Sequence, residues 1–147
     1  SEYIKTYFKR FPGIRAYMDE TKAFAKEHGY VTTAYGRKIN LSGIKSKGPQ
    51  RSFAERQAIN APIQGSAADI IKRAMIRMPD VLAKASLSAR MLLQVHDELV
   101  FECPEAEADK LIETVKTTMQ GAAGPSLQLS VPLVVDARAA SNWAEAH

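Results

Sequence analysis

The stretch that decides the fold is Met91-Leu92-Leu93-Gln94-Val95-His96-Asp97-Glu98-Leu99-Val100-Phe101-Glu102. Two apolar runs of strand-forming residues meet at one histidine and two acids, which predicts an antiparallel β-hairpin. Tight hairpin turns favour glycine or asparagine because these residues tolerate a positive φ, and this junction has neither. A local rule that is broken between two regular strands indicates that the polar residues at the tip serve chemistry.

Asp97 and Glu98 are the candidate metal ligands at this tip. Hard divalent cations such as Mg²⁺ take carboxylate oxygens and usually keep waters and substrate phosphates as further ligands. Neighbouring strand side chains point to opposite faces, so Asp97 is the stronger candidate, and Glu98 joins it only if the turn bends the backbone. The alternative is a charged turn that faces water. His96 either contacts a nucleic acid or is a turn residue, and no second histidine lies nearby to indicate zinc.

Composition limits the class of protein. The chain has 147 residues, 46% hydrophobic and 24% charged, which is typical of one soluble globular core. A single cysteine, Cys103, excludes an internal disulfide and fits a reducing compartment. No apolar run reaches the roughly 18 residues of a membrane helix, and no signal pattern opens the chain. We therefore expect a cytoplasmic protein without a membrane partner, and the absence of a starting methionine suggests part of a longer one.

Positive charge is confined to one region. Residues 1–56 hold twelve Lys or Arg against five acids, a net +7, whereas the rest of the chain is net negative within a total of +4. The excess peaks between Arg37 and Arg56, among glycines, serines and a tyrosine, which suits a polyanion such as a phosphate backbone. Its glycines match no nucleotide-binding fingerprint. The alternative is a solvated surface loop.

The expected elements segregate helices from strands. Periodicity predicts helices over residues 3–10 and from 12 to about 28, a hairpin over 30–41 about Tyr35-Gly36, and helix again over 52–59. Pro62 must kink this last helix or start a new one that continues to about residue 78. After the hairpin of residues 91–102 we expect a helix over 105–119 and a last strand over 129–137. The class is therefore α+β with an antiparallel sheet.

Arg56, Asn60 and Gln64 are spaced four apart across Pro62. On one continuous helix they would share a face, where amide side chains can read the acceptors of the DNA minor groove with little regard to sequence. Such a row is a plausible sensor of a duplex. The alternative is that Asn60 caps a second helix.

Two segments together resemble one family. Residues 56–69 (RQAINAPIQGSAAD) and 94–100 (QVHDELV) resemble the C-terminal part of bacterial family A DNA polymerases. Residues 30–37 and the final NWAEAH extend the resemblance over nearly the whole chain. It implies an antiparallel palm sheet with a catalytic β-hairpin packed by helices, plus a helical fingers-side segment. Residues 1–48 would then be the end of the fingers and 49–147 the C-terminal part of the palm.

The resemblance also implies roles for individual residues. Asp97 would be the second metal-binding aspartate, and Glu98 would support it near the metals. His96 would lie near the primer terminus, and the cofactor would be two Mg²⁺ ions, with Mn²⁺ as a substitute, about 3.5–4 Å apart. DNA contacts would come from Arg37, Lys38, Arg56, Asn60 and Gln64. The partners would be primer-template DNA, dNTP, and the remaining palm, fingers and thumb of a bacterial, nucleoid-associated enzyme.

The sequence also departs from the family pattern. The motif with the other catalytic aspartate, the nucleotide-binding helix of the fingers, the thumb and the exonuclease domain have no counterpart in these residues. We therefore expect no polymerisation by the chain alone, and an incomplete sheet that could drive self-association. The alternative function is a non-catalytic DNA-binding module. Carboxylates beside phosphate favour the enzyme, because their negative charges repel unless a cation intervenes.

Overall fold

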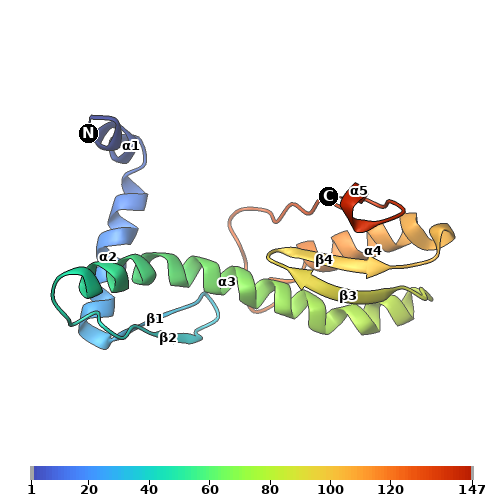
Figure 1. Ribbon diagram of the computed structural model, residues 1–147, viewed down its shortest axis with the longest axis horizontal. Coiled ribbons are helices and arrows are strands. Elements are labelled where there is room, and N and C mark those ends of the chain that lie inside the picture. The colour runs from blue at the N-terminus through green and yellow to red at the C-terminus, as the bar shows by residue number, and fades with distance from the viewer. Residues whose placement is uncertain (1, 147) are drawn as a thin grey trace. The chain divides into compact units, whose positions relative to one another are not determined.

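The computed structural model describes residues 2–146 and divides into two compact units between Ser66 and Ala67. Figure 1 labels the helices and strands of both units. Both contain helices and a two-stranded antiparallel sheet, which confirms the α+β class. No helix among the described residues is long and apolar enough to cross a membrane.

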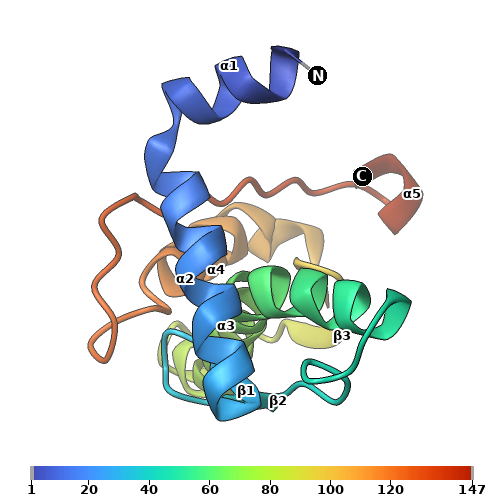
Figure 2. The same cartoon turned by 90° about the vertical axis from the view of Figure 1, so that its left-hand side faces the viewer.

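The first unit begins with two helices, α1 (Glu2–Arg10) and α2 (Pro12–His28), and the chain bends between them (Figure 2). Pro12 occupies the first turn of α2, where a missing N–H costs nothing. Gly29 ends α2 with a φ of 80°, and its N–H donates to the Ala25 carbonyl over 2.8 Å. The predicted restart and stop of this helix are confirmed.

A small hairpin follows, as predicted, with β1 (Tyr30–Thr32) paired to β2 (Lys38–Asn40). Gly36 has a φ of 80° in the connecting turn, a conformation that residues with a Cβ rarely adopt. The core of this unit joins α2, the hairpin, its following loop and the start of α3: Ala25, Val31, Leu41, Ile44, Ala54 and Ala58. The hairpin is thereby fixed against one helix.

That helix, α3 (Pro49–Lys84), is continuous over 36 residues and supplies both units. The structure therefore excludes a second helix that starts at Pro62, and with it a capping role for Asn60. Pro62 cannot donate to the carbonyl of Ala58, but one missing bond is tolerated because the helix packs on both sides of it. Ala58, four residues earlier, is fully buried.

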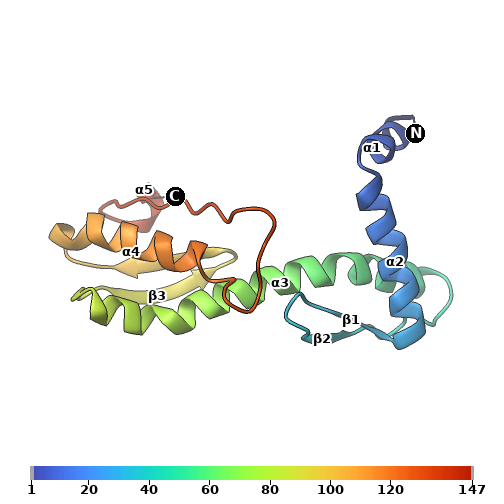
Figure 3. The ribbon, with the colours of Figure 1, turned by 180° about the vertical axis from the view of Figure 1, so that it is seen from behind.

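The second unit packs a hairpin between helices (Figure 3). Strands β3 (Arg90–Val95) and β4 (Glu98–Glu102) form the hairpin, and the chain continues through η1 (Glu105–Glu107) and α4 (Ala108–Gln120). These elements confirm the predicted hairpin and helix. The core combines α3, the α3–β3 loop and α4: Met78, Leu82, Leu87, Leu111 and Val115, with Met91, Leu99 and Phe101 of the hairpin packed against them.

The predicted last strand over residues 129–137 was wrong. The structure shows irregular chain there, followed by the short helix α5 (Trp143–Ala146), which was not expected. A strand needs a neighbour to pair its N–H and carbonyl groups, and this segment has no paired neighbour within residues 2–146. Pro132 also removes one donor.

Candidate active site and nucleic-acid interface

The register of the β3–β4 hairpin determines which side chains face the core. Met91 pairs with Phe101 and Leu93 with Val100, so Leu92 is an extra residue that forms a bulge. Paired residues lie on the same face of a sheet. The bulge therefore places Met91 on the core side with Phe101, and Leu93 on the opposite side, where it is 42% exposed. The same open face carries Val95 and its partner Glu98.

The tip of the hairpin is a two-residue turn, His96-Asp97, between the last strand pair Val95 and Glu98. His96 has a φ of 53°, in the left-handed region that glycine usually occupies. The Gln94 side chain supports this conformation, because its Nε2 donates to the His96 carbonyl over 2.8 Å. The broken turn rule in the sequence is therefore a real feature of the backbone. Sequence reasoning missed the supporting role of Gln94.

The two candidate ligands occupy different positions at this tip. Asp97 is exposed within the turn, whereas Glu98 is partly buried as the first residue of β4. Their donor atoms are hard carboxylate oxygens, which suit Mg²⁺ or Mn²⁺. Within residues 2–146 no group of three or more His, Cys, Asp or Glu side chains comes together. The donors present therefore fit part of a magnesium shell, of the kind that waters and substrate phosphates complete.

The C-terminal helix α5 also reaches this tip. Trp143 and Ala144 line one open pocket of about 500 Å³ together with the four residues from Val95 to Glu98. Asn142 caps α5, since its Oδ1 accepts the Glu145 N–H over 3.1 Å. The sequence carried a signal for this helix, because Asn142 and Glu145 have the spacing of a capping box.

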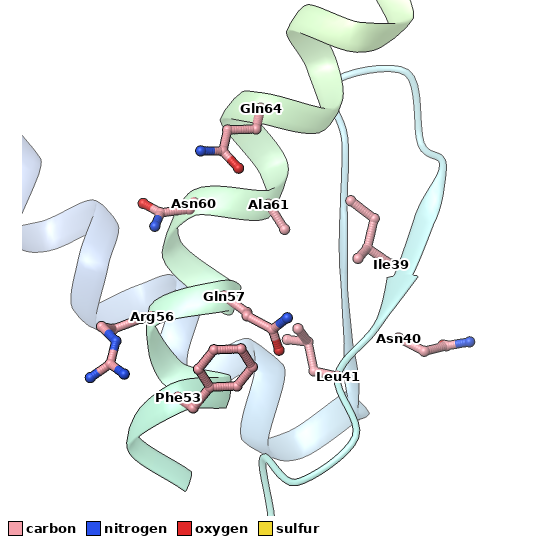
Figure 4. Close-up of a pocket in the computed structure, with 9 residues that line it drawn as sticks. All are labelled: Ile39, Asn40, Leu41, Phe53, Arg56, Gln57, Asn60, Ala61 and Gln64. Atoms are coloured by element: carbon pink, nitrogen blue, oxygen red, sulfur yellow. The ribbon is translucent and has the colours of Figure 1, made fainter. Parts of the chain in front are cut away.

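A second candidate surface lies in the first unit, on α3. Arg56, Asn60 and Gln64 are all exposed and line one open pocket of about 310 Å³ (Figure 4). Because α3 continues through Pro62, the three side chains lie on successive turns of one face. The Arg56 guanidinium lies 6.0 Å from the Phe53 ring centroid, a weak cation–π contact at an exposed site. The shared face predicted for a continuous helix is confirmed.

The β1–β2 hairpin also lines this pocket, through Ile39 and Asn40 of β2, and Leu41 follows directly after the strand. Arg37 and Lys38, the two cations predicted to bind DNA from this hairpin, have different surroundings. The Arg37 Nη2 donates to the Gly65 carbonyl on α3 over 3.1 Å. The Lys38 ammonium instead lies 4.5 Å from the Tyr30 ring centroid of its own hairpin. Both residues are exposed.

Part of the positive charge of this unit is paired internally. The carboxylate of Glu55 accepts a hydrogen bond from the Arg51 guanidinium at 3.0 Å and contacts the Lys26 ammonium at 3.2 Å. These two cations hold the pKa of Glu55 below its ordinary value of 4.5. Glu55 thus links α2 to α3. Arg51, one of the cations in the basic region of the sequence, is paired with this carboxylate.

The comparisons with known proteins agree with this arrangement. The profile of DNA polymerase family A matches residues 1–145. DNA polymerase I of Rhizobium leguminosarum is 54% identical over 99% of this chain, and that of Pseudomonas aeruginosa is 51% identical over 99%. The POL domain of Pol1 from M. smegmatis, solved in complex with a DNA primer-template and dNTP, matches 88% of the chain with a TM-score of 0.80 and 45% identity.

The chain covers only a small part of the length of each relative. The chain spans 15% of the Rhizobium protein, 16% of the Pseudomonas protein and 22% of the M. smegmatis chain. Within the chain itself the match extends from residue 1 to residue 145. It includes the hairpin tip and the row of Arg56, Asn60 and Gln64 on α3, called the α3 row below. The chain belongs to DNA polymerase family A.

Proposed function

We propose that this chain supplies one carboxylate hairpin and part of the duplex-holding surface of a bacterial DNA-directed DNA polymerase. The reaction is template-directed nucleotidyl transfer from a dNTP to a primer 3′-hydroxyl, in replication and repair in the bacterial cytoplasm. The observation that carries the proposal is the exposed Asp97 next to the left-handed His96, in a turn held by Gln94, in a chain of this polymerase family. Residues in such backbone conformations cluster at active sites and ligand-binding sites.

Asp97 would hold a divalent metal ion, Mg²⁺ or Mn²⁺, with Glu98 in a supporting position. Bound metal would supply positive charge for the developing charges of an in-line phosphoryl displacement. The role of this chain is to orient carboxylate oxygens toward that ion, whose charge would offset the repulsion between carboxylate and phosphate. His96 lies next to Asp97 in the turn and would contact the primer terminus.

The row on α3 would hold the duplex. Asn60 and Gln64 carry amide groups that can donate to the N3 and O2 acceptors of the minor groove, which occur on every base pair. Arg56 adds a cation to the same face, and Lys38 would contact the phosphate backbone. A polymerase needs this kind of contact, since it must hold any correctly paired sequence.

The remaining components would come from outside these residues. The other catalytic aspartate, the helix that binds the incoming nucleotide and the thumb have no counterpart in the sequence. Residues 1–48 would contribute to the fingers and residues 49–147 to the palm. The isolated chain should therefore not extend a primer, and its incomplete sheet could self-associate.

A first experiment measures binding of the chain to a fluorescent primer-template duplex across a salt series. Affinity that falls steeply with salt is expected, since each neutralised phosphate contributes a slope of about −0.9. No binding at low salt would mean that the α3 surface does not hold DNA by itself.

A second experiment tests the catalytic role in a chimera, in which residues 1–145 replace the matching segment of the Rhizobium enzyme. Asp97→Ala should abolish incorporation and leave primer-template affinity within about twofold, because the carboxylate acts on the reacting phosphate rather than on the duplex. Asp80→Ala, which removes another exposed aspartate, is the matched control and should extend primers normally. Equal loss of binding and incorporation in the Asp97 variant would support the alternative, a non-catalytic DNA-binding module.

A further inference from the structure

Two hydrogen bonds, together called the clasp below, hold the loop of the β1–β2 hairpin to a single turn of α3. The Ala34 N–H donates to the Ser66 Oγ over 2.8 Å, and the Arg37 Nη2 donates to the Gly65 carbonyl over 3.1 Å. Ser66 is itself held in place, because its hydroxyl donates to the Pro62 carbonyl over 2.5 Å. Its oxygen therefore faces the loop as an acceptor.

Gly65 allows this close approach. A Cβ at this position would lie 2.7 Å from the Thr33 Cγ2, well inside contact distance, and 3.4 Å from the Arg37 Nη2. A glycine in the interior of a helix costs about 1 kcal/mol relative to alanine, so its presence here reflects the contact rather than the helix. Two hydrogen bonds and one close packing contact thus converge on residues 65 and 66.

The clasp adjoins the α3 row and its pocket. Gln64, the last residue of the row, immediately precedes Gly65, and Gln64 lines the pocket together with Ile39, two residues after Arg37. The clasp therefore fixes β2, which lines the pocket, to the turn of α3 that carries Gln64. Lys38 has the same charge and a similar exposure, but its ammonium lies over the Tyr30 ring within the hairpin.

We propose that Arg37 is a positioning residue, which acts with Ser66 to hold β2 against the turn of α3 that carries Gln64, rather than a ligand of the DNA phosphate backbone. This proposal rests on the proposed duplex-binding role of the α3 row. It assigns different roles to two neighbouring cations, Arg37 and Lys38, that sequence alone treats alike.

The salt dependence of DNA binding separates the two roles. Lys38→Ala should weaken binding and reduce the magnitude of the salt slope by about 0.9, the value for one phosphate contact. Arg37→Ala should weaken binding by about tenfold, the effect of one misplaced hydrogen bond, and leave the slope unchanged. Ser66→Ala, which changes no charge, should behave like Arg37→Ala. A slope that falls by about 0.9 in the Arg37 variant would overturn the proposal.

A double-mutant cycle provides the second readout. If Arg37 acts through Gln64, then Arg37→Ala should cost little in a Gln64→Ala background. If the two losses multiply, Arg37 acts independently and the positioning role is wrong. All variants are compared at a temperature where circular dichroism shows each of them fully folded, so that loss of folding is not read as loss of binding.

A measurement without DNA keeps the proposal separate from the proposed function. In a ¹⁵N NMR spectrum of the free chain, Arg37→Ala should shift the side-chain amide signals of Gln64, whereas Lys38→Ala should leave them in place. Unchanged Gln64 signals in the Arg37 variant would refute the positioning role even if the chain binds DNA. If the signals shift but the chain binds no DNA, the positioning role of Arg37 stands and the proposed duplex-binding role of the α3 row is wrong.

Discussion

Gly65→Ala is the substitution that tests the packing of the first unit most directly. The new Cβ would lie 2.7 Å from the Thr33 Cγ2 and 3.0 Å from the Ile39 Cδ1, against an optimum of about 3.5–4.0 Å for two carbons. Thr33 is only 4% exposed and is β-branched, so it has few alternative rotamers. Its backbone N–H also donates to the Arg37 carbonyl over 3.0 Å. The side chain therefore has little room to move away.

The expected cost is a balance of three effects. Overpacking of this kind costs about 1–3 kcal/mol, and loss of the Arg37–Gly65 hydrogen bond adds about 0.5–1.5 kcal/mol. Against these, alanine favours a helix interior over glycine by about 1 kcal/mol. We expect Gly65→Ala to destabilise the first unit by about 0.5–3.5 kcal/mol.

The matched control is Gly13→Ala in the first turn of α2. A Cβ at Gly13 would meet nothing within 4 Å, so this variant should be neutral or more stable by up to about 1 kcal/mol. Hydrogen exchange of the Ala34 amide, which donates to Ser66, reports on the clasp locally. Faster exchange is expected only in the Gly65 variant. If both variants gain stability alike, the close approach at Gly65 does not exist in solution.

Three further substitutions have defined outcomes in urea unfolding followed by circular dichroism. His96→Val should destabilise the second unit by about 1–3 kcal/mol, because a β-branched residue resists the left-handed φ of 53°. The control His96→Gly should not destabilise the unit, because glycine adopts this φ without strain. Met78→Ala removes a fully buried side chain and should cost about 2–5 kcal/mol, whereas Ile76→Ala, 77% exposed on the same helix, should stay within about 0.5 kcal/mol. The Arg51 guanidinium holds the pKa of Glu55 below 4.5, so the stability from this group is present above that value and is lost as pH falls through the lowered pKa. Glu55→Gln should accordingly unfold with a weaker dependence on acid pH than the parent chain, and an unchanged dependence would show that the ion pair contributes nothing.

Much of the fold could be predicted because local signals and packing agree. The stop of α2 follows from Gly29, and both hairpins follow from runs of strand-forming residues around short polar turns. The predicted effect of Pro62 on the helix was too large, since α3 continues through this residue. Burial of the helix on either side of Pro62 outweighs one missing hydrogen bond. The strand predicted over residues 129–137 needed a neighbour that residues 2–146 do not provide.

The place of the candidate site was predictable from the sequence, and the residues that support it were less so. A histidine and two acids where a turn expects glycine identify the hairpin tip, and the left-handed His96 agrees with that interpretation. The supports come from residues without a periodic pattern. Gln94 acts through one side-chain bond, and Trp143 belongs to a helix of four residues. The capping-box spacing of Asn142 and Glu145 was the only sequence signal for that helix.

Arg37 and Lys38 show why charge patterning alone cannot assign roles. Each adds one positive charge to the same exposed hairpin, so composition and spacing treat them as equivalent contacts for a polyanion. What separates them is the backbone of Gly65, 28 residues later, which accepts from Arg37 only because no Cβ holds the hairpin away. A glycine inside a predicted helix signals such an approach but does not say which residue makes it. The pairing appears only when α3 is continuous, and this continuity is also what brings Arg56, Asn60 and Gln64 onto one face. The same packing that overrides Pro62 therefore determines both the surface proposed to hold DNA and the clasp proposed to position it.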